Sequence, residues 1–145
     1  MSLQMSRNDL NAFMREFFPE VAGDIQVVKV AEASISVEMQ VGAGNLRPGG
    51  TVSGPTMFTL ADVTIYLAIL AMIGPQALAV TTNCSIDFMR KPAAGRRLRA
   101  DGRILKLGQA LAVGDVLVFS EGMGAPVARA SLTYSIPPQR AAKTE

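Results

Sequence analysis

Hydrophobic residues near the start of the chain recur with the spacing of a helix. Four of them stand at positions i, i+3, i+4 and i+7 and so share one helix face: Leu10, Phe13, Met14 and Phe17. Either Ser6 or Asn8 is suited to cap such a helix, and Pro19 stops it. The pattern predicts a short amphipathic helix over residues 6–18.

From residue 25 the spacing of hydrophobic residues changes to two. Over residues 34–41 they alternate with polar residues, which is typical of a half-buried strand: Ile35, Val37, Met39 and Val41. Residues 25–30 are the expected hairpin partner. Further strand-like segments, separated by turns rich in Gly and Pro, are expected over residues 77–90, 96–107, 110–121 and 126–136.

A long apolar segment lies between the two groups of strands. Ser53 is a favoured N-cap residue and Pro55 is favoured in the first turn, which predicts a helix that runs to about Ile73 and ends at Gly74. Its uninterrupted apolar run begins only at Ile65 and is shorter than the roughly 20 residues that cross a bilayer. We therefore expect a buried core helix and no membrane insertion.

The order of these elements predicts an α+β fold in a single domain over residues 1–145. A helix that is apolar nearly all round must be covered on most sides, and a curved antiparallel sheet wrapped around it does this. Residues 25–136 form the expected core, and the polar tail over residues 137–145 is expected to be disordered. The N-terminus lacks an apolar run followed by a small-residue cleavage site, which predicts a cytoplasmic protein.

Asp62 is the only charged residue within the long apolar helix. A carboxylate there is costly unless a neighbour satisfies it or the protein uses it. The chain has no His and a single cysteine, Cys84, so Cys/His zinc sites, Ser-His-Asp triads and an intrachain disulfide are excluded. Asp62 is therefore the leading candidate for a catalytic group, and the alternative is a carboxylate that only makes hydrogen bonds within a core.

Three short motifs mark this helix and the strand after it: Ser-Gly-Pro over residues 53–55, Leu-Ala-Asp over 60–62 and Phe-Met-Arg-Lys-Pro over 88–92. With them, the segment from about residue 25 to 136 resembles the hotdog-fold acyl-CoA thioesterases, particularly the group related to the phenylacetate-pathway and hydroxybenzoyl-CoA enzymes. That family opens its central helix with His-Gly-Gly and follows it with Leu-Ala-Asp or Leu-Ala-Glu. The resemblance implies a hotdog fold and hydrolysis of a coenzyme A ester without a metal or cofactor.

The resemblance also implies roles for individual residues. Asp62 corresponds to the general base or nucleophile, the Gly54 amide polarises the thioester carbonyl, and Thr81 falls about where some members place a hydroxyl that helps hold the attacking water. The family's His is replaced by Ser here, its second Gly by Pro and its Asn by Arg. Candidate substrate contacts near the helix start are Asn45, Arg47, Ser53 and Phe58. Because of these replacements, a non-catalytic acyl-CoA binding or sensing protein stays open as the alternative.

The spacing between Asp62 and Gly54 has a consequence for assembly. Eight residues separate them, which places their Cα atoms about 12 Å apart along one helix. One subunit cannot easily bring both groups to the same carbonyl, so Asp62 of one chain is expected to face Gly54 of its partner in a homodimer. Association of two such dimers stays open.

Basic residues are concentrated after the motif over 88–92. Seven of the 14 lie between residues 90 and 106, and those that flank the turn are candidates to hold the phosphates of coenzyme A: Arg90, Lys91, Arg96 and Arg97. A solvated strand face is the alternative interpretation. No aromatic stacking pair accompanies the charges, so a nucleic-acid partner is not expected.

The strand over residues 81–88 is expected to present two different faces. Period two assigns one set to the face that covers the helix: Thr82, Cys84, Ile86 and Phe88. The other set is expected to face the subunit interface and the site: Thr81, Asn83, Ser85 and Asp87. Thr81 or Asn83 would then be placed to position water.

Overall fold

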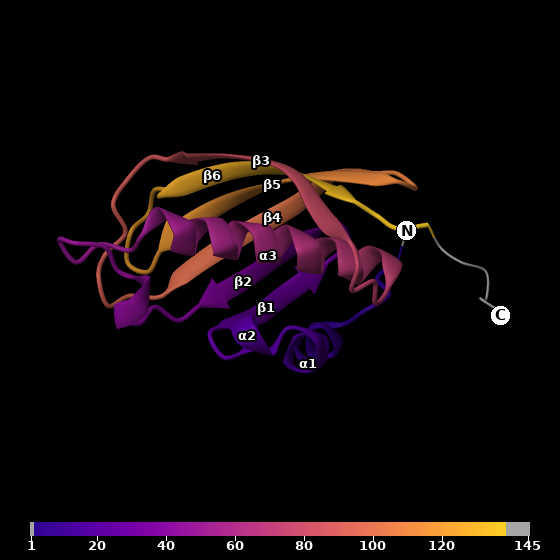
Figure 1. Ribbon diagram of the computed structural model, residues 1–145, viewed down its shortest axis with the longest axis horizontal. Helices are drawn as coiled ribbons and strands as arrows, with labels where there is room; N and C mark the ends of the chain where they lie inside the picture. The colour runs from indigo at the N-terminus through magenta and orange to yellow at the C-terminus, as the bar shows by residue number, and fades with distance from the viewer. Residues whose placement is uncertain (1, 139–145) are drawn as a thin grey trace.

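The computed structural model describes residues 2–138. Six antiparallel strands form one sheet that curves around a long central helix, and two short helices lie beside the first two strands (Figure 1). This is the α+β hotdog arrangement that the sequence predicted. The predicted disordered tail lies outside the described residues from residue 139 onward.

The strands occur in the sheet in the order β1-β2-β4-β5-β6-β3, so β1 and β3 are its edges. Their bounds are β1 Ile25–Ala31, β2 Ser34–Met39, β3 Val80–Phe88, β4 Leu98–Leu107, β5 Leu111–Ser120 and β6 Ala128–Ser135. Each falls on a segment where alternation predicted a strand, and the expected hairpin between the first two strands is confirmed. The helices are α1 Arg7–Phe17, α2 Pro19–Ala22 and α3 Gly54–Ile73, with a 3₁₀ turn over Ala43–Asn45.

The sequence predicted the start of α1 correctly but missed the short helix after it. Ser6 is the N-cap: its hydroxyl accepts from the Asp9 amide, and the Asp9 carboxylate accepts from the Ser6 amide in return. Pro19 does end α1, but it also opens the four-residue helix α2. Proline is favoured at the first helical position because it has no amide hydrogen to satisfy there, which explains why a second helix begins at this residue.

The core is built on α3, whose side chains are buried on most sides. Leu60, Ile65 and Leu67 have no exposed surface. By length and composition alone α3 qualifies as a membrane span, but 78% of its most apolar window is buried inside the fold. The packing therefore supports the expectation that α3 is a core helix rather than a membrane span.

Two glycines let the sheet approach α3 closely, and Gly114 in β5 is the tighter of them. A Cβ atom there would lie 2.7 Å from Ile65 Cδ1 and 2.8 Å from the Arg103 carbonyl oxygen. We expect Gly114→Ala to lower the free energy of unfolding by about 1–3 kcal/mol, because the backbone carbonyl cannot rotate away as a side chain can. Urea denaturation followed by circular dichroism measures this.

Gly124→Ala is the matched control for that measurement. No heavy atom lies within 4 Å of a Cβ at Gly124, and the residue does not have a positive φ. A loss at Gly114 no larger than at Gly124 would contradict the crowding of this position by Ile65 and the Arg103 carbonyl.

A bulge in β3 corrects the faces that the sequence predicted. Thr81 pairs with Tyr134 and Asn83 with Thr133, so Thr82 is the extra residue between them. Thr81 therefore faces α3, on the same side as Cys84, and Thr82 does not. The polar set was wrongly assigned to one face because strict period two holds only in a strand without a bulge.

Candidate active site

Asp62 lies near the middle of α3 on its partly exposed side, and two hydroxyl groups from the sheet reach its carboxylate. The Thr81 hydroxyl donates to Asp62 Oδ1 at 2.5 Å, and the Tyr134 hydroxyl lies 2.8 Å from the same oxygen. Tyr134 also lies 2.9 Å from the Asp62 carbonyl oxygen. Asp62, the charge predicted to need a partner, thus has two hydrogen-bond partners, one from β3 and one from β6.

Asp62, Thr81 and Tyr134 line a cavity of about 580 Å³. The other lining residues are mostly apolar and come from the end of α1, from α3 and from the segment that leads into β3: Phe17, Phe18, Val63, Tyr66, Ala77, Leu78, Ala79 and Val80. Tyr66 stacks at 6.2 Å from Tyr134 between ring centroids, and its hydroxyl donates to the Ala77 carbonyl. The cavity is therefore an apolar chamber with one carboxylate in its wall.

Electrostatics keep the neighbours of Asp62 in their protonated forms. Burial, and then the negative charge of Asp62, raise the pKa of Tyr134 far above its usual range. The same two causes raise the pKa of the Cys84 thiol. Cys84 is half-buried against the core, which is typical of a small packing residue rather than a nucleophile.

The shift at Cys84 predicts how fast this thiol is alkylated. Because its pKa is raised, the thiolate fraction at pH 8 is below that of an ordinary cysteine, and we expect slow reaction with iodoacetamide. Asp62→Asn removes one cause of the shift and should speed the reaction. Mass spectrometry of the native chain, with the urea-unfolded chain as control, measures both rates; an unchanged rate in the variant would contradict the electrostatic contact.

At the start of α3, Ser53 and Asn45 form a capping network. The Ser53 hydroxyl accepts from the Thr56 amide at 3.3 Å and lies 2.8 Å from the Thr56 hydroxyl. The Asn45 side chain accepts from the Gly42 amide at 2.8 Å and donates to the Thr56 hydroxyl at 3.4 Å. Both candidate substrate contacts thus fix the loop and the helix start, which is the role predicted for Ser53 as N-cap.

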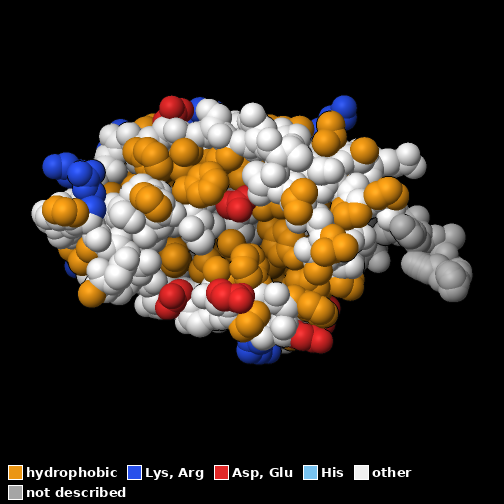
Figure 2. All heavy atoms as spheres, in the orientation of Figure 1, with side chains coloured by type: hydrophobic (Ala, Val, Ile, Leu, Met, Phe, Trp, Pro, Cys, Tyr) orange, Lys and Arg blue, Asp and Glu red, His pale blue; other side chains and the backbone are white. Residues whose placement is uncertain are grey.

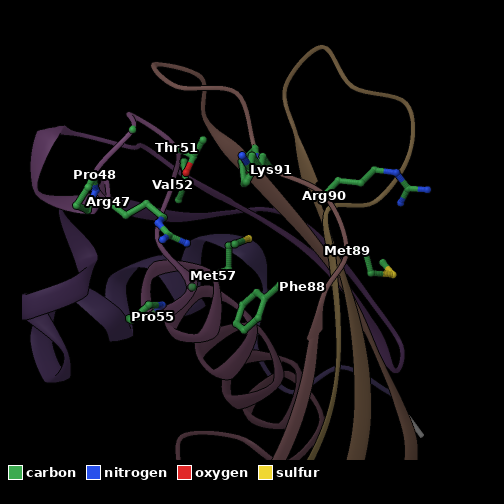
Figure 3. Close-up of a pocket in the computed structure, with 13 residues that line it drawn as sticks. Arg47, Pro48, Thr51, Val52, Pro55, Met57, Phe88, Met89, Arg90 and Lys91 are labelled. Carbon is green, nitrogen blue, oxygen red and sulfur yellow. The ribbon is translucent and has the colours of Figure 1, made fainter.

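The Gly54 amide opens onto a second, larger cavity. Within the described residues this amide has no hydrogen-bond partner, and the helix N-terminus adds a partial positive charge. The cavity measures about 720 Å³ and includes Arg47, Phe88 and Lys91 in its lining. Figure 3 shows Arg47 reaching over it, with the Phe88 ring beside the start of α3. A carbonyl oxygen bound here would meet an amide donor and nearby cationic groups.

The remaining basic candidates do not all lie at the cavity beside Gly54. Arg90 lines the same cavity but extends away from it in Figure 3, and it donates to the Pro126 carbonyl at 2.7 Å. Arg97 pairs with Glu38 and Glu121 at 3.3 Å each and lines a separate hollow of about 210 Å³. Arg96 is not among the lining residues of the cavity at Gly54.

The bulge also moves Asn83 away from the site of its own chain. Asn83 is exposed and pairs with Thr133 on the sheet face that points away from α3. Thr81 alone of the two predicted water-positioning residues therefore lies beside Asp62.

Tyr134 is the site residue that the sequence analysis missed. In β6 the buried positions alternate with partly exposed ones, and the buried set is Ala128, Ala130, Leu132 and Tyr134. Tyr134 is the one member of that inward face with a polar end. A buried tyrosine usually needs a hydrogen-bond acceptor, so the alternation in β6 was the signal that could have pointed to Asp62.

The exposed surface around α3 is unusually apolar. The residues of α3 that are not buried form one stripe over its first half, with spacings of three and four, plus Ile73 at its end: Gly54, Pro55, Phe58, Thr59 and Asp62. Large hydrophobic side chains at the start of β3 and just before it are exposed beside the stripe, including Leu78 at 73% and Val80 at 55%. Figure 2 shows apolar side chains gathered on the face around α3, with an acidic side chain among them.

Comparison with known proteins identifies the class. The family model of the thioesterase superfamily matches residues 49–127. A candidate thioesterase from Silicibacter sp. TM1040 is 54% identical to this chain, with a TM-score of 0.89, 95% of this chain covered and 96% of that one. The chain therefore belongs to the thioesterase superfamily, and it is a thioesterase, as the sequence predicted.

More distant solved structures share the fold. The PaaI protein from the phenylacetic acid degradation operon of E. coli is 26% identical, with a TM-score of 0.77 and coverage of 88% of this chain and 91% of that chain. A protein of Streptococcus mutans UA159 bound to acetyl-CoA is also 26% identical, with a TM-score of 0.71 and coverage of 81% and 91%. A comparison with curated proteins gave no match.

Proposed function

We propose that this protein hydrolyses the thioester of an acyl-coenzyme A at sites shared by two chains. Asp62 of one chain acts on a carbonyl that is held by the Gly54 amide of the other. The observation that carries this proposal is the separation of the two groups: they line different cavities of one chain and stand about 12 Å apart along α3. A two-fold axis between two chains brings Asp62 of each chain to the Gly54 amide of the other.

Phe58 supports this geometry because it lies midway between Gly54 and Asp62 in the sequence and in the exposed stripe of α3. If two α3 helices lie antiparallel across a two-fold axis, the residue at the midpoint meets its own copy. Phe58 is 38% exposed in the single chain. A dimer would therefore bury this ring, and its role becomes a subunit contact beside the substrate rather than a substrate contact alone.

The edge of the sheet supports the same interface. Among the described residues, β3 has a strand neighbour on one side only, and it is flanked by exposed Leu78 and Met89. An apolar edge strand of this length invites pairing with another chain, and natural proteins seldom leave one uncovered. Pairing of β3 with its copy would extend the sheet and cover the stripe of α3 at the same time.

The chemistry follows from the two groups. In the general-base route, Asp62 takes a proton from water while the water oxygen attacks the carbonyl carbon, and the Gly54 amide stabilises the negative oxygen that forms. The C–S bond then breaks, and the thiolate leaves and is protonated. In the nucleophilic route, Asp62 Oδ2 attacks the carbonyl carbon, the thiolate leaves, and water hydrolyses the resulting anhydride. Both routes stay open.

The two cavities suit the two halves of such a substrate. Arg47 and Lys91 beside the larger cavity offer charge-assisted hydrogen bonds to the phosphates of coenzyme A. The apolar chamber beside Asp62 suits the acyl group. The acetyl-CoA bound by the Streptococcus mutans protein supports a coenzyme A ester as the ligand.

A panel of acyl- and aroyl-coenzyme A esters tests the proposal. We expect release of free coenzyme A thiol, measured continuously with a chromogenic disulfide, to saturate with at least one ester. Calorimetry with the same esters measures binding separately. Binding of an ester without any thiol release would overturn the hydrolysis and favour the non-catalytic sensing protein instead.

A further inference from the structure

Tyr134 lies at the centre of the hydrogen bonds that fix Asp62. It is 3% exposed, and its register partner across the sheet is Thr81, so both hydroxyls point to α3 from neighbouring strands. The two hydroxyls converge on one carboxylate oxygen, Asp62 Oδ1. The Tyr134 hydroxyl also lies 2.9 Å from the Asp62 carbonyl oxygen, so its single proton faces two acceptors of the same residue.

The second carboxylate oxygen is different. Within the described residues, no hydrogen-bond donor reaches Asp62 Oδ2. Asp62 is also partly exposed, in the wall of the apolar chamber. The two oxygens of one carboxylate are thus unequal: Oδ1 is held by the sheet, and Oδ2 is left to meet water or substrate.

We infer that Tyr134 is a positioning residue for the proposed hydrolysis: with Thr81 it holds Asp62 Oδ1 so that Oδ2 is the oxygen presented to the attacking water or to the thioester. This inference rests on the proposed function. The bulge at Thr82 is part of the arrangement, because it turns the Thr81 side chain toward α3 next to Tyr134.

The tyrosine is suited to this task by its protonation state. Burial and the charge of Asp62 raise its pKa, so the phenol keeps its proton and remains a donor throughout the pH range in which thioesterases are assayed. Without the phenol, Thr81 alone holds the carboxylate, and the Asp62 side chain is free to leave the productive rotamer. A misplacement of about 1 Å costs up to about a hundredfold in rate.

Tyr134→Phe tests the inference, because it removes one oxygen atom and keeps the buried ring. We expect kcat to fall about ten- to a hundredfold with KM within about twofold, since this buried hydroxyl bonds to Asp62 and the ring that lines the cavity is kept. Ser131→Ala is the matched control: it also removes one hydroxyl from β6, but from the partly exposed face of that strand, opposite the buried face that carries Tyr134. Its kcat should be unchanged. Circular dichroism confirms that both variants are folded.

A double-mutant cycle separates positioning from a general structural role. Tyr134→Phe is measured again in the Asp62→Asn background, under single-turnover conditions with excess protein. If Tyr134 acts through Asp62, Tyr134→Phe should lower the rate little further in the Asp62→Asn background. The same fold loss in both backgrounds, or a folded Tyr134→Phe variant with full kcat, would overturn the inference. Full activity of Asp62→Asn itself would instead overturn the proposed function.

Discussion

Asp62→Asn is expected to lower kcat for thioester hydrolysis about a thousandfold, because an amide neither accepts a proton from water nor attacks a carbonyl at a useful rate. KM should change little, since the chamber and the cavity at Gly54 keep their shape. Asparagine has almost the same volume as aspartate and can still accept the hydroxyls of Thr81 and Tyr134 through its amide oxygen. The substitution should therefore lower kcat without unfolding the protein. Steady-state kinetics measure the rate, and thermal denaturation measures the stability.

Asp87→Asn is the matched control for that substitution. Asp87 is also a carboxylate with a side-chain partner, but it is exposed on β3 and pairs with Arg129 at 2.9 Å on the face away from α3. Its removal costs an exposed ion pair, which contributes little to stability, and leaves kcat unchanged. Equal losses of kcat in the Asp62→Asn and Asp87→Asn variants would show that Asp62 does not act as a base or nucleophile.

Gly54→Val is expected to give the second large loss, about a hundredfold or more in kcat. The amide of Gly54 is the donor proposed to stabilise the developing oxyanion, and removing one such donor in other enzymes costs about a hundred- to a thousandfold. A Cβ at this position would lie 3.2 Å from the Phe88 ring, and the rest of the valine side chain would fill the space in front of the amide. Kinetics with the best ester of the panel measure the effect.

Gly23→Val provides the comparison for Gly54→Val. Gly23 follows α2 with helical dihedral angles, and a Cβ there meets no heavy atom within 4 Å. The substitution therefore introduces the same side chain without blocking a cavity, and activity should be retained. A Gly54→Val variant that hydrolyses esters at the wild-type rate would remove the amide from the mechanism.

The fold could be predicted from sequence because its local signals agree with each other. The alternation around Val37 specifies a half-buried strand, Ser53 and Gly74 mark the ends of α3, and the apolar surface of α3 demands a cover that the predicted strands provide as a curved sheet. The bulge at Thr82 was not predictable in this way. The residues around Thr82 favour a strand equally well whether or not one of them is bulged. The bulge is set by the register in which β3 pairs with β6.

The candidate site was predictable where one residue stands out from its surroundings. Asp62 does so as the single charge of an apolar helix, and its identification needed no tertiary information. Tyr134 was missed because its partner lies 72 positions away and is reached only when β6, β3 and α3 pack together. Arg97 shows what sequence cannot supply for a basic residue: its pairing with Glu38 and Glu121 depends on the packed sheet, and its assignment to substrate stays a prediction.

The central claim is that each active site takes Asp62 from one chain and the Gly54 amide from the other, and co-expression of two inactive variants tests it most directly. Equal amounts of Asp62→Asn and Gly54→Val chains are produced together, and thiol release per chain is compared with each variant alone. Random pairing makes about half of the dimers mixed, each with one intact site of two, so activity should recover to about one quarter of wild type. If both groups instead acted within one chain, every site would carry a defect, and the mixture would be as inactive as the separate variants.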